Sequence, residues 1–237
     1  MLFSLLQAEG AEVIGQAAAS PVPQEMSYSL IDMAVKGGWL MIVLVLLSIV
    51  AIYIFGKKLW VINRAAKVDR HFLDDVKDYI HDGKTKSAIT YCGKFDTPVA
   101  RLVEKGLERI GRPLADIQSA IENVGNLEVA RLEKGLPILA TIAGGAPMIG
   151  FLGTVTGMVR AFFNMANAGN NIDITLLSSG IYEAMITTVG GLIVGILAYF
   201  GYNYLTSRID NVVYEIENAT IEFMDVLNEP EEGKKEE

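Results

Sequence analysis

Two long stretches of this 237-residue sequence contain almost no charged side chain. Residues 135–159 contain none, and residues 174–207 contain only Glu183. A third apolar run extends from Gly38 to Gly56 and is followed by two lysines. A helix of about 20 apolar residues is long enough to cross a bilayer. The sequence therefore predicts a membrane protein with three transmembrane helices.

The average composition conceals these apolar stretches. The net charge is −8, yet 51% of the residues are hydrophobic and the mean hydropathy is +0.34. An acidic chain is disfavoured as a nucleic-acid-binding protein, because such proteins present basic surfaces. Cys92 is the only cysteine, which excludes a disulfide within the chain, and the two histidines lack the spacing of metal ligands. No metal site is predicted.

The distribution of basic residues predicts the orientation of the chain. Fifteen of the twenty Lys and Arg residues lie between Lys57 and Lys134. Loops rich in Lys and Arg remain in the cytoplasm. We therefore expect the N-terminus outside and the C-terminus inside, with spans at 38–56, 136–163 and 176–207.

The remaining segments complete an all-α fold, since no alternating strand pattern of useful length is present. The first ten residues lack the basic start of a signal peptide and are expected to be retained. The cytoplasmic helices are expected to break near Gly83, Gly93 and Gly111–Pro113. The expected segments are a periplasmic N-terminal segment with a short interfacial helix (1–37), a cytoplasmic helical domain (57–135), a periplasmic loop (164–175), a cytoplasmic helix (208–228) and a disordered charged tail (229–237).

An apolar seam with steps of four and three residues follows the third span. It consists of Ile209, Val213, Ile216, Thr220, Phe223 and Leu227. This heptad pattern predicts that the last transmembrane helix continues into the cytoplasm and packs against other helices. The seam is equally compatible with the core of a helical bundle and with a contact between subunits.

Glu183 is the most informative residue of the sequence. A charged side chain at the centre of a transmembrane helix costs about 2.5–3.5 kcal/mol on insertion scales. Desolvation penalises only the charged form of an acid, so a carboxyl group can avoid this cost by taking up a proton. We therefore expect Glu183 to load and release protons. The alternative is a structural role, in which it bonds to a neighbouring helix or lies near the outer surface.

Hydroxyl groups accompany this glutamate and predict a polar path. Thr187 lies four residues after Glu183 and shares its helical face, Thr188 lies next to it, and Thr154 lies in the second span. Their hydroxyls could hold the waters that connect the path. We expect Arg160, near the outer end of the second span, to extend to the lipid headgroups.

Small residues in the second and third spans predict close helix contacts, since glycine lets helix backbones approach each other. The candidates are Gly150, Gly153, Gly157, Gly190, Gly191 and Gly195. Pro147 interrupts the second span and is expected to kink it.

Two long blocks of the sequence resemble the MotA/TolQ/ExbB proton channel family, and ExbB in particular. They read LEKGLPILATIAGGAPMIGFLGTVTGMVRAF (132–162) and SGIYEAMITTVGGLIVGILAYFGYN (179–203), and the resemblance extends weakly to TPVARLVEKGLERIGR (97–112). By these motifs Glu183 matches the family's intramembrane glutamate, and Thr154 and Thr188 match its threonines. The chain departs from the pattern at Thr187, where close relatives often have alanine, and at Gly144–Gly145, where relatives often have a hydroxyl residue.

The resemblance implies a function in the bacterial inner membrane. Members form rings, usually homopentamers, whose pore receives the transmembrane helix of an ExbD- or TolR-like protein with an essential aspartate. The proton motive force drives the assembly, which acts on the outer membrane through a TonB-like protein. Protons would then be the coupling ion, with no other cofactor.

Several other functions remain open. Within the family, a TolQ-like role in envelope maintenance or a gliding motor is the main alternative, whereas flagellar stators usually have four spans. A passive membrane scaffold would use Glu183 only to hold helices together. An enzyme is not expected, because Glu183 has no second acid or nucleophile at membrane depth.

Overall fold

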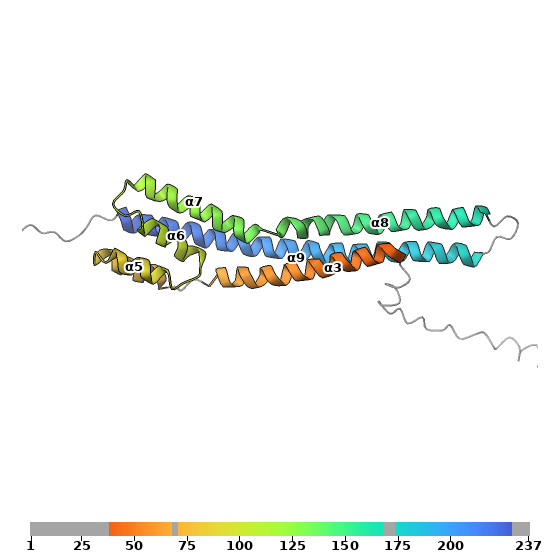
Figure 1. Ribbon diagram of the computed structural model, residues 1–237, viewed down its shortest axis with the longest axis horizontal. Coiled ribbons are helices and arrows are strands. Elements are labelled where there is room, and N and C mark those ends of the chain that lie inside the picture. Colours follow the sequence, from red (N-terminus) through yellow and green to blue (C-terminus); the bar gives the residue numbers. More distant parts are fainter. Residues whose placement is uncertain (1–37, 68–70, 168–173, 229–237) are drawn as a thin grey trace, which may run out of the picture.

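The computed structural model describes residues 38–67, 71–167 and 174–228, and within them every regular element is a helix (Figure 1). The predicted interfacial helix within 1–37 and the predicted tail at 229–237 lie outside the described residues. The helices are α3 (Gly38–Ala65), α4 (Phe72–His81), α5 (Thr85–Cys92), α6 (Pro98–Leu107), α7 (Leu114–Glu133), α8 (Leu136–Asn167) and α9 (Ile174–Asn228).

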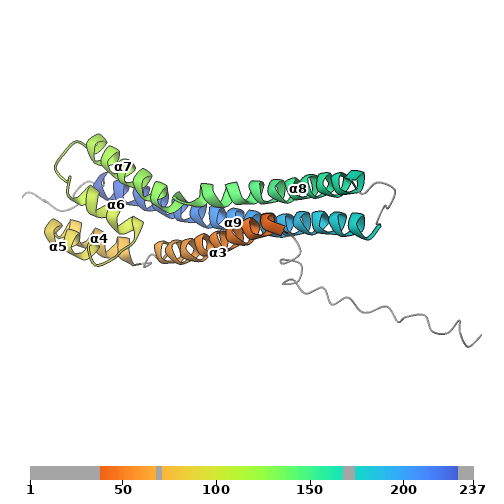
Figure 2. The ribbon, with the colours of Figure 1, turned by 45° about the vertical axis from the view of Figure 1, so that its right-hand side comes forward.

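Three long helices, α3, α8 and α9, lie side by side and form the apolar part of the molecule (Figures 1 and 2). Each of the three candidate spans is long and apolar enough to cross a membrane. Large apolar side chains cover their outer surfaces, including Ile42, Leu46, Ile52, Phe151, Val159, Phe163, Ile196, Leu197 and Phe200. Such a surface is unfavourable in water and suits a lipid environment or contact with other membrane helices.

The start of α3 does not reach as far as the ends of its two neighbours. Figures 1 and 2 show that α8 and α9 continue well beyond the first turn of α3, at the end where the chain turns from α8 to α9. The first turn of α3 therefore lies against the sides of these helices instead of level with their ends.

Helices α4, α6 and α7 pack against the C-terminal half of α9, and α5 packs against α4 and α6 (Figure 2). The chain turns between them at glycines with positive φ, Gly83 (+69°) and Gly111 (+93°), a conformation that side chains disfavour. Thr97 caps α6, since its hydroxyl accepts a hydrogen bond from the Ala100 N–H at 3.3 Å, and Pro98 occupies the first turn.

The heptad seam of α9 lies in the core of this bundle. Ile209, Ile216 and Phe223 are each at most 5% exposed, and the Phe223 ring lies directly over Gly106 of α6. Of the two interpretations of the seam, the structure therefore favours an intrachain core. The helix is continuous through the predicted boundary at 207–208, so α9 joins the membrane part to the bundle without a break.

An ion network around the buried Glu128 joins α6 to α7. The Glu128 carboxylate is 5% exposed and accepts hydrogen bonds from the Arg101 guanidinium at 2.6 Å and from Arg131 at 2.5 Å. Burial lowers the pKa of Arg101, but the charges of Glu128 and Asp96 outweigh burial and the pKa is raised. The bundle is thus held by charge as well as by apolar contact.

The junction between α7 and α8 is held by a lysine from α3. The Lys58 ammonium donates hydrogen bonds at 3.0 Å to the carbonyls of Arg131 and Leu132, which are exposed at the end of α7. Gly135, with a φ of +97°, then turns the chain into α8. This contact connects the end of α3 to the junction between bundle and membrane helices.

Candidate proton-binding site

Glu183 lies in the membrane part of α9, nine residues or about 14 Å after the start of the helix. Its side chain is 39% exposed and lines a small pocket between α3, α8 and α9. The volume of about 20 Å³ is enough for about one water molecule. The lining residues are Gly38, Trp39, Leu40, Gly153, Thr156, Gly157, Arg160, Glu183 and Thr187.

Arg160 is the charged neighbour of this glutamate. One guanidinium nitrogen of Arg160 lies 3.9 Å from Glu183 Oε1, at the outer limit of an ion pair. Arg160 lines the pocket with Glu183, and its predicted extension to the lipid headgroups remains a prediction. The Arg160 side chain is 64% exposed in the single chain.

Of the three threonines predicted for the proton path, Thr187 is the one that lines the pocket with Glu183. It is 3% exposed, and its hydroxyl donates a hydrogen bond to the Ala184 carbonyl at 2.7 Å. The Thr187 side chain occupies the space that a side chain on Gly153 would need. The glycine of α8 is therefore what allows this hydroxyl to lie between the two helices.

The other two predicted threonines do not line this pocket. Thr188 donates a hydrogen bond at 3.0 Å to the Gly150 carbonyl, which joins α9 to α8. Thr154 donates within its own helix, to the Phe151 carbonyl at 2.6 Å. Within one chain, these two hydroxyls are occupied by helix backbone, and their roles in proton transfer remain predictions.

Thr156 and Arg160 were not assigned to the site from the sequence. Both follow Gly153 at helical spacing, three and seven residues on, so they share the face that α8 presents to α9. The spacing could have predicted this placement. The face of α8 that carries Gly153 packs against the helix of Glu183, so other residues on the same face also lie near the carboxylate.

The predicted packing glycines lie at helix contacts. Five of them face the α8–α9 contact, where an added Cβ would approach within 3 Å of the opposite helix: Gly150, Gly153, Gly157, Gly191 and Gly195. Gly190 instead faces α3, with Met41 at 3.0 Å from its ideal Cβ. Pro147 lies inside α8 with its ring against Gly195, and its predicted kink remains a prediction.

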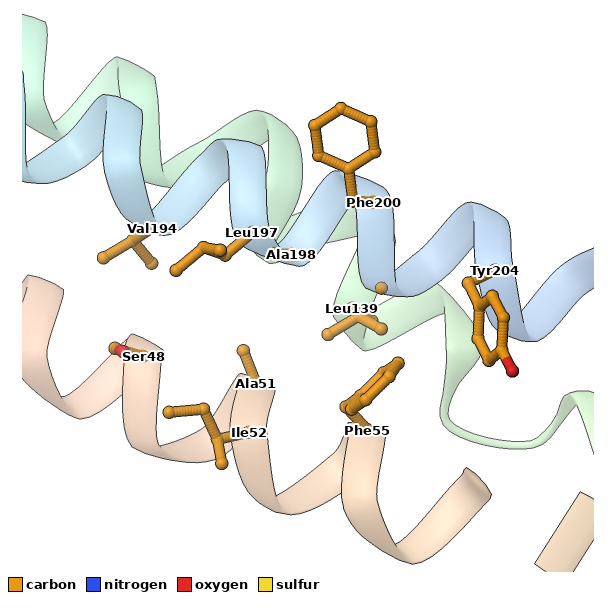
Figure 3. Close-up of a pocket in the computed structure, with 11 residues that line it drawn as sticks. Ser48, Ala51, Ile52, Phe55, Leu139, Val194, Leu197, Ala198, Phe200 and Tyr204 are labelled. Carbon is orange, nitrogen blue, oxygen red and sulfur yellow. The ribbon is translucent and has the colours of Figure 1, made fainter. Parts of the chain in front are cut away.

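A larger cavity of about 420 Å³ lies between α3 and α9, away from this site (Figure 3). Figure 3 shows Ala51 of α3 directed toward α9, and Phe55 of α3 next to Leu139 of α8. Its lining includes no charged side chain. Val194 is three turns from Glu183 along α9, so this apolar space takes no part in the polar site.

Within residues 38–67, 71–167 and 174–228, no three His, Cys, Asp or Glu side chains lie close enough to hold a metal ion. The polar groups around Glu183 are one guanidinium and hydroxyls, which do not form a metal site with a single carboxylate.

The amino-acid sequence is similar to known proteins over most of its length. The sequence model of the MotA/TolQ/ExbB proton channel family matches residues 94–218. A Methanothermobacter thermautotrophicus protein described as a biopolymer transport protein ExbB homolog is 30% identical over 193 residues, 80% of this chain and 67% of the relative. A biopolymer transport protein ExbB-like protein of Synechocystis sp. is 31% identical over 80% of this chain and 76% of its own. The Tol-Pal system protein TolQ of Haemophilus influenzae is 31% identical over 65% of this chain and 66% of its own.

Proposed function

Because this chain belongs to the MotA/TolQ/ExbB proton channel family, we propose that it is an ExbB-like subunit of a proton-driven motor. The motor converts the proton motive force into mechanical work in the bacterial inner membrane. It energises TonB-dependent transport across the outer membrane, together with an ExbD-like single-span partner. Protons are the coupling ion.

The observation that carries the proposal is the setting of Glu183. It is the only acid in an otherwise uncharged span, and it shares a water-sized pocket with the buried hydroxyl residue Thr187. A carboxyl group there can exchange a proton with a water molecule, whereas a purely structural carboxylate needs no such space. The same geometry argues against a passive scaffold.

The exposed apolar surface supports assembly with other membrane helices. Only 22–33% of the most apolar window of each span is buried within the single chain. A ring of copies, with the helix of the partner in its pore, would cover much of the remaining surface. The aspartate of the partner would then exchange protons with Glu183, while Thr154, Thr187 and Thr188 hold the connecting waters.

The energetics of this coupling are reasonable. One charge crossing a potential of about 100 mV releases about 2.3 kcal/mol, before any pH gradient is added. This energy can shift the balance between two arrangements of packed helices. It is too small to free a proton that is deeply trapped, which is consistent with a partly exposed carboxyl group.

The substitution Glu183→Gln tests the proposal, because glutamine keeps the shape but cannot carry a proton. The complex with its single-span partner should assemble normally, and imaging of it would show the number of subunits in the ring. The protonophore-sensitive part of TonB-dependent transport across the outer membrane should fall to the background level. The control is Glu215→Gln, since Glu215 is an exposed acid of the same helix outside the membrane part. Full energy-dependent uptake in the Glu183→Gln strain would refute a proton-driven role.

A TolQ-like role in envelope maintenance is the second candidate. The similarity to TolQ of Haemophilus influenzae over 65% of this chain favours keeping it. A deletion strain distinguishes the two roles: an ExbB-like subunit is needed for energy-dependent uptake, whereas a TolQ-like subunit is needed for a detergent-resistant outer membrane.

A further inference from the structure

The apolar cavity between α3 and α9 has the volume of a ligand site. Its 420 Å³ lies within the range of about 300–1,000 Å³ that is usual for small-molecule pockets. Its walls include the buried side chains of Ala51, Leu139 and Ala198. Ile52 and Leu197, which are 67% and 65% exposed, also line it, so the cavity reaches the outer apolar surface of the long helices. A molecule dissolved in the bilayer can therefore enter from the side.

The length of the cavity matches one leaflet of a bilayer. Val194 and Tyr204 lie at its two ends along α9 (Figure 3). Ten residues of an α-helix span about 15 Å, which is half of a hydrocarbon core of about 30 Å. A helix of that length and about 10 Å in diameter would occupy about 1,200 Å³, much more than the cavity provides. The space thus fits a single hydrocarbon chain better than it fits a helix of another protein.

Polar groups gather at one end of the cavity, the end nearer the helical bundle. Tyr204 lines the cavity there, and the centroids of the Tyr204 and Phe55 rings are 6.4 Å apart. One turn further along α9, the Arg208 guanidinium donates a hydrogen bond at 2.9 Å to the Asn63 side chain of α3. This bond places the guanidinium between the two helices, next to the bundle end of the cavity.

The charges at this end suit an anionic headgroup. A guanidinium carries five N–H donors, so Arg208 can donate to a phosphate oxygen as well as to Asn63. Lys57 and Lys58 lie within one turn of Phe55 on α3 and add positive charge at this level. Basic side chains next to a membrane span attract anionic lipids. The cavity thus combines an apolar body with a basic end, as a site for a phospholipid requires.

We propose that this cavity binds one acyl chain of an anionic phospholipid, whose phosphate group lies at Tyr204 and Arg208. In the predicted orientation the lipid belongs to the cytoplasmic leaflet, where anionic lipids are common. The chain fills the space between α3 and α9 and packs against both helices. The inference is independent of the proton-driven role, because the cavity shares no lining residue with the Glu183 pocket.

Native mass spectrometry of the full-length chain in mild detergent tests this site. Phosphatidylglycerol is the anionic probe, phosphatidylcholine is the comparison lipid, and inorganic phosphate is the competitor. We expect one phosphatidylglycerol molecule per chain to bind more tightly than phosphatidylcholine, without displacement by phosphate. Ala51→Leu and Ser48→Leu add carbon atoms at lining positions and should weaken this binding about tenfold, because displacing two methylene groups from apolar contact is sufficient.

Matched variants separate the site from general contact with lipid. Gly56→Leu introduces leucine on α3 outside the cavity, where no heavy atom lies within 4 Å of an added Cβ, and its binding should match the wild type. Arg208→Gln should reduce the preference for phosphatidylglycerol about tenfold, the loss expected for one charge-assisted hydrogen bond. Asn63→Ala removes the hydrogen bond between the helices but keeps the guanidinium, so the preference should remain.

Each outcome supports or overturns the inference. If Ala51→Leu and Ser48→Leu bind phosphatidylglycerol as tightly as Gly56→Leu does, the cavity holds no lipid chain. The inference is also wrong if these two variants weaken only the association between copies of the chain, because side chains of a neighbouring copy then fill the cavity. Displacement by inorganic phosphate would show that Arg208 binds a free anion. If Ala51→Leu accumulates poorly, Ser48→Leu and Arg208→Gln still provide the test.

Discussion

At the scale of single residues, Cys92 shows how burial controls chemistry. The thiol is 1% exposed in the core of the helical bundle. Burial, and secondarily the charge of Glu104, raises the pKa of Cys92 from 9.0 to about 12. Since the thiolate is the reactive form, Cys92 should be inert while the bundle is folded.

We predict that iodoacetamide modifies Cys92 at pH 8 at least a hundredfold more slowly than it modifies a Lys86→Cys thiol in a Cys92→Ala chain. Lys86 is exposed on α5, so its replacement supplies a matched accessible thiol. Quantifying the alkylated peptide over time gives both rates. Equal rates would show that the bundle opens freely around Cys92.

The raised pKa of the Cys92 thiol also predicts that the folded protein loses stability in alkali. The folded bundle keeps the Cys92 proton to higher pH than the unfolded chain, so the protonated thiol stabilises the fold fully only below about pH 9. The free energy of unfolding should then decrease as the pH rises from 9 toward 12. In Cys92→Ala this part of the pH dependence should be absent, as thermal unfolding at several pH values would measure.

At the scale of helices, α9 is the element that joins the site to the helical bundle. It extends without interruption over 55 residues, a length of about 82 Å. Its N-terminal half carries Glu183, and its C-terminal half forms the bundle core with Phe223. Helix α9 therefore connects the carboxylate to the bundle without a break.

The α8–α9 contact should be far less tolerant than the exposed face of α8. An ideal Cβ on Gly191 would be 2.6 Å from the Ala146 carbonyl oxygen and 2.9 Å from Gly150 Cα, and backbone atoms cannot rotate away. We predict that Gly191→Ala destabilises the protein by about 2–3 kcal/mol, as expected for overpacking. Thermal unfolding in detergent would measure the change.

Gly144→Ala and Gly145→Ala are the controls for this prediction, since no heavy atom lies within 4 Å of an added Cβ at either position. Alanine is a better helix former than glycine, so both should be neutral or slightly stabilising, by up to about 1 kcal/mol. If Gly191→Ala were as stable as these variants, the helix contact would be looser than the structure describes.

At the scale of the whole molecule, the chain has an apolar half of three long helices and a charged half of shorter ones (Figure 1). The end of α8 and the short helix α5 lie at opposite ends of this arrangement. The two ends should therefore face different aqueous compartments if the charge distribution sets the orientation.

Cysteine labelling tests this orientation in a Cys92→Ala chain. We predict that a membrane-impermeant maleimide labels Asn167→Cys in spheroplasts and labels Lys86→Cys only after the membrane is permeabilised. Both positions are exposed, so access to the reagent determines the result. The reverse pattern would overturn the predicted orientation, and labelling of both in spheroplasts would exclude a sealed crossing.

The sequence by itself determined the helical architecture, because the relevant signals are local. Uncharged runs indicated three long apolar helices, and the glycines at 83 and 111 marked breaks between the shorter helices, as the structure confirms. The proximity of Thr187 to Glu183 also follows from sequence, since four residues make one turn of a helix. Each of these inferences depends on neighbours within a few positions.

Only the tertiary structure decided what surrounds Glu183 and what covers the seam of α9. Gly38 is 145 positions from Glu183 in the chain, and Arg160 lies on another helix, so their contacts depend on how far each helix slides along its neighbours. The seam through Phe223 could equally have faced another subunit until Gly106 was found beneath it. Periodicity specifies which face of a helix is buried, whereas the register between helices is set by side-chain shape across the contact, which no local pattern encodes.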